Sequence, residues 1–66
     1  MANDLYVKQV RVNLERVLSD MEGCCGSPIL ADALFHQIAK RYPNVEVWIV
    51  FDFINENIKS GRIEYV

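Results

Sequence analysis

The sequence has no excess of positive charge. Seven Lys and Arg residues stand against nine Asp and Glu residues, so the formal net charge at pH 7 is -2. No overall positive field therefore draws the chain toward nucleic acid or anionic lipid. Any contact with phosphate groups has to come from a local cluster of basic side chains.

Long hydrophobic runs are also missing. The longest apolar run extends from Val47 to Phe51, whereas a membrane-spanning helix requires about 20 apolar residues. The N-terminal stretch MANDLYVKQV has Asn3 and Asp4 near its start and no apolar run followed by a cleavage-type site, so it is unlike a secretory signal. These absences predict a cytoplasmic protein that makes no contact with membranes.

Motifs that carry chemistry are scarce as well. Cys24 and Cys25 are adjacent, and neighbouring cysteines rarely reach disulfide geometry without backbone strain. Asp32 and His36 are four residues apart and so share a helix face, but the paired Cys or His spacing of a zinc site is absent. No glycine-rich phosphate loop follows a strand, and so small a domain encloses little space. The sequence therefore predicts no catalytic residue, no metal and no cofactor.

Enough apolar residues are present for one small core. Hydrophobic residues make up 52% of the chain and charged residues 24%, which is typical of a folded globular protein. A chain of 66 residues is near the lower limit at which a core alone stabilises a fold. We expect one domain over residues 1–66, and we expect a homodimer because a second subunit adds buried surface.

Two segments show helical periodicity. Over residues 4–22, apolar residues recur on one stripe, and Gly23 is suited to end the helix. The run GCCGSP then breaks the chain and places both cysteines in a loop. Ile29 and Leu30 form a short extended piece before a second helix at about residues 31–41. The predicted inward residues are Val7, Val10, Leu14, Val17, Leu18 and Met21 in the first helix and Leu34, Phe35 and Ile38 in the second.

The segment from residue 45 onward is ambiguous. As a strand, VEVWIVFDF alternates and is rich in β-branched and aromatic residues, which gives an alternative α+β fold with a C-terminal hairpin over residues 45–66. As a helix, its apolar and polar sides stay separate through INENIK, where strand alternation fails. Asn44 can cap this helix and Gly61 can end it, so we favour the helix, followed by a short strand at RIEYV. Its predicted apolar stripe is Val47, Val50, Phe51, Ile54 and Ile58.

Residues 27–66, SPILADALFHQIAKRYPNVEVWIVFDFINENIKSGRIEYV, resemble the DNA-binding half of ferric uptake regulator proteins, chiefly through RYPNV and SGRIEYV. The resemblance implies a mainly α, three-helix winged-helix-like helix-turn-helix with one or two short strands. No second wing strand follows RIEYV, so no complete wing is expected. The second domain of that family, which holds its metal sites and dimer interface, has no counterpart here, so metal sensing is not implied.

Departures from the family favour a protein partner over DNA. An aromatic residue followed by arginine contacts DNA in the family's third helix, but the matching pair here is Phe51 and Asp52, and a carboxylate repels phosphate. Trp48 either packs into the core or lies exposed among acids, as in protein-binding surfaces. The last strand either pairs with residues 29–30 of its own chain or offers an open edge to a second copy, and the second is the more attractive reading. We predict a non-enzymatic protein-interaction module whose contact residues are Trp48, Asp52, Asn55, Glu56, Ile63 and Tyr65.

The alternative function is that of a small transcriptional regulator that dimerises on duplex DNA. Four basic residues near the turn and the last strand can form a modest rim that contacts phosphates, and such contacts weaken steeply with salt. These residues are Lys40, Arg41, Lys59 and Arg62.

Overall fold

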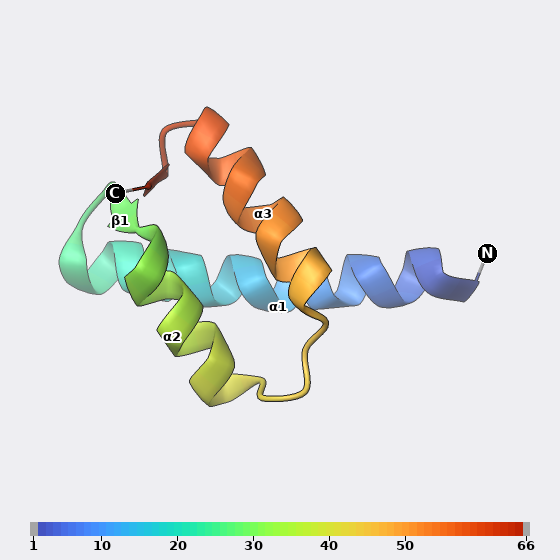
Figure 1. The fold of residues 1–66 in the computed structure, drawn as a ribbon. Helices are drawn as coiled ribbons and strands as arrows, with labels where there is room; N and C mark the ends of the chain where they lie inside the picture. The colour runs from blue at the N-terminus through green and yellow to red at the C-terminus, as the bar shows by residue number, and fades with distance from the viewer. Residues whose placement is uncertain (1, 66) are drawn as a thin grey trace.

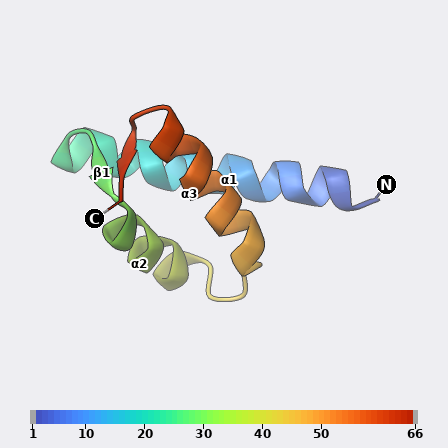
Figure 2. The same cartoon turned by 45° about the horizontal axis from the view of Figure 1, so that its top comes forward.

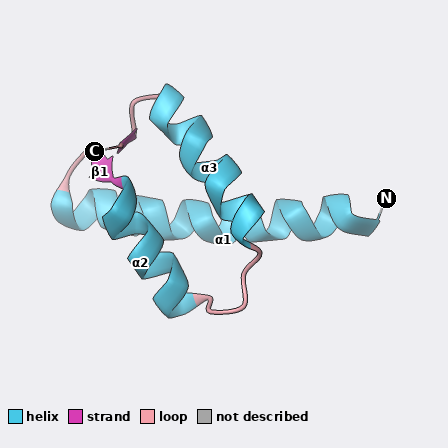
Figure 3. Ribbon diagram, viewed as in Figure 1, coloured by secondary structure: helices cyan, strands magenta, loops and turns pink. Residues whose placement is uncertain are grey.

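The computed structural model describes residues 2–65, which form three helices and two short strands (Figure 1). The mainly helical fold with short strands is confirmed, and the C-terminal hairpin alternative is wrong because residues 47–59 are helical (Figure 3). The elements are α1 (Ala2–Cys25), β1 (Ile29–Leu30), α2 (Ala31–Arg41), α3 (Val47–Lys59) and β2 (Ile63–Glu64).

Helix α1 is the long base of the fold. Helices α2 and α3 lie across one side of it, and its N-terminal end projects beyond α3 (Figures 1 and 2). The apolar stripe predicted for α1 faces these two helices and forms the floor of the core. Its buried members are Val10, Leu14, Val17 and Leu18, with Val7 and Met21 packed against them.

The end of α1 differs from the prediction. The helix continues through Gly23 and includes both cysteines, so the loop predicted for Cys24 and Cys25 is wrong. Gly26 is the residue with positive φ, at 82°, and its backbone N–H donates to the carbonyl oxygen of Glu22 at 3.0 Å. A glycine takes this left-handed conformation without a steric penalty, so the helix stops one turn later than expected.

Helix α2 has the predicted bounds but only part of the predicted inward face. Leu34 and Ile38 are buried as expected. Phe35 is 38% exposed and lies at the outer surface, so its assignment to the core is wrong. The helix ends at Arg41, because the proline after Tyr42 disfavours the helical conformation at Tyr42.

The sequence correctly indicates the residue that ends helix α3 but not the residue that caps its start. Its N-cap residue is Glu46, which makes no capping hydrogen bond through its side chain, rather than the predicted Asn44. At its end, Gly61 has a φ of 86° and donates its N–H to the carbonyl oxygen of Ile58 at 3.1 Å. The predicted role of Gly61 in ending the helix is confirmed.

The inward side of α3 is rotated from the predicted stripe. Ile49 and Phe53 are buried together with Val50 and Ile54. Val47 and Phe51, which the pattern placed inward, are more than half exposed. The core therefore receives the pairs 49/50 and 53/54, which are four residues apart and share one side of a helix.

Strand β2 completes the sheet of its own chain. It pairs in parallel with β1, Ile29 opposite Ile63 and Leu30 opposite Glu64, and the backbone N–H of Ile29 donates to the Arg62 carbonyl oxygen at 2.9 Å. Ile63 is 2% exposed and belongs to the core. The more attractive prediction, an open strand edge with Ile63 as a contact residue, therefore disagrees with the burial of that side chain.

Candidate protein-binding surface

The outward side of α3 carries an unusual number of large apolar side chains. With four residues of the helix buried in the core, the side facing solvent is left with Val47, Trp48 and Phe51, which are 52%, 53% and 53% exposed. Asp52 and Asn55 are exposed beside them. Three predicted contact residues, Trp48, Asp52 and Asn55, thus lie on one accessible surface.

Phe51 is joined at this surface by Phe35 of α2. Their rings are stacked, with centroids 6.0 Å apart and planes at 16°. Sequence reasoning missed this pair because both residues fell on predicted inward stripes. A sequence signal did exist, since Ile49 and Phe53 are also spaced four apart and offer an equally apolar stripe that would leave Phe51 outside.

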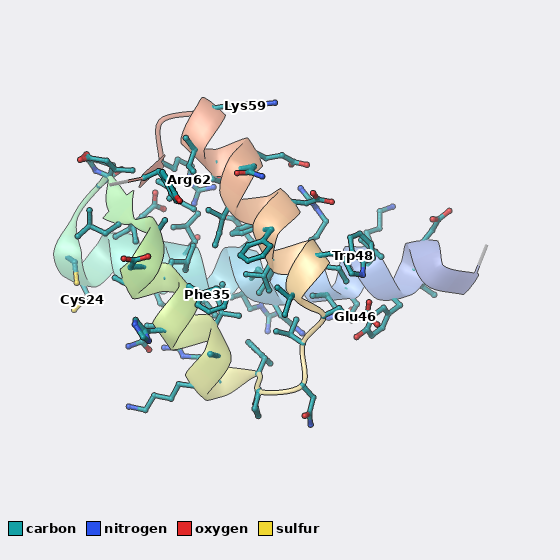
Figure 4. All side chains as sticks on the ribbon, viewed as in Figure 1. Cys24, Phe35, Glu46, Trp48, Lys59 and Arg62 are labelled. Atoms are coloured by element: carbon teal, nitrogen blue, oxygen red, sulfur yellow. The ribbon has the colours of Figure 1, made fainter. Side chains whose placement is uncertain are left out.

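Trp48 is held at the surface by its indole nitrogen. Its Nε1–H donates a hydrogen bond to Oε2 of Glu46 at 2.5 Å, at the start of α3 (Figure 4). Of the two readings of this residue, the exposed one applies. An anchored indole loses less conformational freedom on binding than a free one, which favours contact with a partner.

A shallow groove separates α2 from α3 on this outer side. We call it the α2–α3 groove. Phe35 and Phe51 lie along it, Asp32 and Asn55 supply polar groups, and Tyr65, itself 76% exposed, also lines it. The remaining lining residues are Ala31 and Ile54.

Glu56 is exposed but already paired. Its carboxylate forms an ion pair with Arg11 of α1, and the Arg11 guanidinium also lies 6.0 Å from the centroid of the Phe53 ring. These contacts fix α3 to α1 from the side opposite the α2–α3 groove. Glu56 thus serves the fold in this structure, in contrast to its predicted place among the contact residues.

The predicted phosphate-contacting rim is broken up by ion pairs. Arg62 donates to both carboxylate oxygens of Glu15 at 2.8 and 3.0 Å and to both of Glu22 at 2.8 and 3.1 Å. Arg41 pairs with Asp20 at 3.3 Å. Lys40 and Lys59 remain exposed, and Figure 4 shows Lys59 extending outward from the end of α3. Two of the four predicted phosphate contacts are therefore occupied by carboxylates.

The ion-pair cluster of Arg62, Glu15 and Glu22 shifts the pKa values of these three residues. Hydrogen bonds from Arg62 lower the pKa of Glu15 and of Glu22 below the ordinary value, against the smaller opposing effect of burial. The two carboxylates raise the pKa of Arg62 further above neutrality. The cluster joins β2 to α1 and stays charged at neutral pH.

Other chemistry-bearing residues do not converge. Within residues 2–65, no three His, Cys, Asp or Glu side chains are placed to hold a metal ion. Cys24 and Cys25 are exposed free thiols, and a hydrogen bond to Cys24 raises the pKa of the Cys25 thiol. No helix in this part of the chain is long and apolar enough to cross a membrane.

Comparison with protein-family models, with curated proteins and with solved structures finds no match to this chain. The resemblance to ferric uptake regulators therefore stays a prediction.

Proposed function

We propose that this protein is a non-enzymatic interaction module that binds another protein through the outward side of α3 and the adjoining α2–α3 groove. The observation that carries the proposal is the stacked pair Phe35 and Phe51, left at the surface beside Trp48. Burying these rings inside the protein would have stabilised a small core, so their exposure has a cost to the fold.

The composition of the surface supports this proposal. Aromatic residues are enriched at the centres of protein interfaces, and Trp most often dominates the binding energy. Contiguous exposed apolar surface on a small protein commonly marks an interaction site. Asp52 and Asn55 provide the polar margin that such interfaces have. We also propose a cytoplasmic location, since Cys24 and Cys25 are both free and exposed, as thiols are in a reducing compartment.

A photo-crosslinking experiment tests the proposal. Phe51 is replaced by the photoreactive analogue p-benzoylphenylalanine, which preserves an aromatic side chain, and the labelled protein is irradiated in a native extract. The control places the same group at Tyr6 of α1, an aromatic residue of similar exposure, 48% against 53%. We expect a discrete crosslinked partner at position 51 that is absent at position 6. Identical patterns at the two positions, or no adduct at position 51, would refute the proposed surface.

The DNA-binding alternative has weaker support. Only Lys40 and Lys59 of its four residues are exposed without an ion pair in residues 2–65, and Asp52 lies on the side of α3 that would face the DNA.

A further inference from the structure

We propose, resting on the function proposed above, that the occupant of the α2–α3 groove is a cationic amphipathic helix of another protein. Its apolar side would lie on Phe35 and Phe51, and its basic residues would reach Asp32 in the groove and the exposed carboxylates on the neighbouring surface. The proposal follows from where the unneutralised charges of this chain lie.

The acidic residues divide into two groups. Four carboxylates are neutralised by arginine within the fold, namely those of Glu15, Asp20, Glu22 and Glu56. Five have no ion-pair partner in residues 2–65. Four of those five lie on or beside the outer side of α2, α3 and the sheet: Asp32, Glu46, Asp52 and Glu64.

Each of these acids lies next to an exposed apolar residue. Asp32 lines the groove from α2, and Asp52 follows Phe51 on the exposed side of α3. Glu46 holds the Trp48 indole, and Glu64 lies next to Leu30 in the sheet, where its side chain is exposed. Lys59, at the far end of α3, is the one exposed lysine of that helix. An apolar groove that contains Asp32 and lies next to other unpaired acids is complementary to a helix that carries Lys or Arg beside its apolar stripe.

The same charges argue against a second copy at this surface. A two-fold interface brings identical surfaces together, so the exposed Asp32 and Asp52 of one copy would lie close to those of the other. Like charges placed across an interface are destabilising. DNA and anionic lipid are disfavoured for the same electrostatic reason.

A helix fits this groove better than an extended strand. The groove is bounded by α2 and α3, whose backbone N–H and C=O groups are paired within each helix along its middle turns. An added strand would find no free backbone groups there, because strand addition requires an exposed sheet edge. Side-chain anchors at i, i+3 or i+4, and i+7 of a docked helix match a floor made of side chains.

The test uses synthetic peptides and the fluorescence of Trp48, the single tryptophan of the chain. The probe is a Leu/Lys peptide of about 18 residues, five helical turns, with Leu on one side. One control is its scrambled sequence, which keeps the charge but loses amphipathicity; the other is a Leu/Glu peptide with the same pattern. We expect a saturable blue shift with the Leu/Lys peptide alone, with a dissociation constant on the order of 10 µM.

Matched variants place the binding in the groove. Phe51→Ala should weaken Leu/Lys binding about tenfold, as loss of an aromatic anchor does. Asp52→Asn should weaken it severalfold, whereas Asp4→Asn, which removes an exposed acid on α1, should leave it unchanged. Circular dichroism of each variant verifies that the fold is retained.

Several results would overturn the inference. Equal binding of the scrambled or Leu/Glu peptide would show that amphipathicity or positive charge is not what the groove selects. If sedimentation detects a dimer and the Phe51→Asp substitution dissociates it, the occupant of the groove is a second copy of this chain. That result would refute the cationic helix but would still support the proposed protein-binding surface. The photo-crosslinking experiment can also refute the inference. If the partner segment crosslinked at position 51 is acidic or extended, the occupant is not a cationic helix, but the proposed protein-binding surface is still supported.

Discussion

Arg62 illustrates how a residue's charge can be known from sequence while its role is not. It follows a glycine and begins the predicted strand, and the sequence suggests it as a phosphate contact. In the fold, its guanidinium is shared by Glu15 and Glu22 of α1, residues 47 and 40 positions earlier in the chain. Bidentate arginine–carboxylate pairs have a geometric fit that single surface pairs lack. Sequence spacing carries no information about contacts this distant, so the structural role could not be predicted.

Replacing Arg62 should therefore lower the stability of the fold, because its side chain is engaged in ion pairs and not in phosphate contacts. We expect Arg62→Ala to lower the free energy of unfolding by about 1 kcal/mol, a value for a partly exposed ion-pair cluster screened by solvent. Lys59→Ala, an exposed lysine with no ion pair in residues 2–65, should change it by less than about 0.5 kcal/mol. Urea denaturation followed by circular dichroism measures both, and equal effects would contradict the assignment.

The same cluster predicts how stability depends on pH. Arg62 lowers the folded-state pKa of Glu15 and Glu22 below the usual 4.5, so folding favours their charged forms. The stabilisation is fully present above about pH 4.5 and is lost as pH falls through the lowered values. We expect the difference in stability between wild type and Arg62→Ala to shrink as the pH falls from 6 to about 3. A difference that stayed constant over this range would mean that the pKa shifts are absent.

At the scale of the element, α3 shows how far periodicity alone can go. Its existence, its approximate bounds and its ending at Gly61 follow from the sequence. The side that it buries does not, because only Asp52 is polar among its first eight residues and two stripes are almost equally apolar. In the fold, Arg11 of α1 lies over the Phe53 ring and pairs with Glu56, so α1 contacts the stripe that leaves Phe51 outside.

Two alanine substitutions on this helix separate the stripes. Phe53 is 3% exposed, so Phe53→Ala should cost about 3 kcal/mol through lost burial and the cavity left behind. That is a large fraction of the stability of so small a domain. Phe51 is 53% exposed, and Phe51→Ala should cost less than about 1 kcal/mol. Thermal unfolding of the two variants compares them directly, and the reverse order would support the stripe predicted from sequence.

At the scale of the molecule, charge distribution matters more than net charge. The totals exclude a strong positive field but leave a local basic patch open. Folding removes much of that patch, because three of the seven basic side chains pair with acids, and it leaves the unpaired Asp32 in the aromatic groove. Neither consequence is visible in the composition, since each depends on which side chains the tertiary fold brings together.

Binding to duplex DNA should consequently be absent under conditions that favour it most. We expect no saturable change in the fluorescence anisotropy of a labelled duplex at about 50 mM salt and protein up to about 100 µM, a range that detects ordinary non-specific binding. The DNA-binding alternative would instead be supported by binding that falls steeply with added salt and disappears in a Lys40→Ala, Lys59→Ala double variant. Protein binding through the α3 surface is independent of this result.

The parallel pairing of β1 with β2 also has a consequence for the order of events during synthesis. Ile63 fills the core beside Ile29, and Arg62 ties its strand to the middle of α1, so the core is open until this segment is present. While the ribosome still holds residue 63, α1 and α2 have no complete surface to pack against. We therefore expect the core to close in one cooperative step once residues 62–64 have left the exit tunnel, with the aromatic residues accessible to chaperones until then.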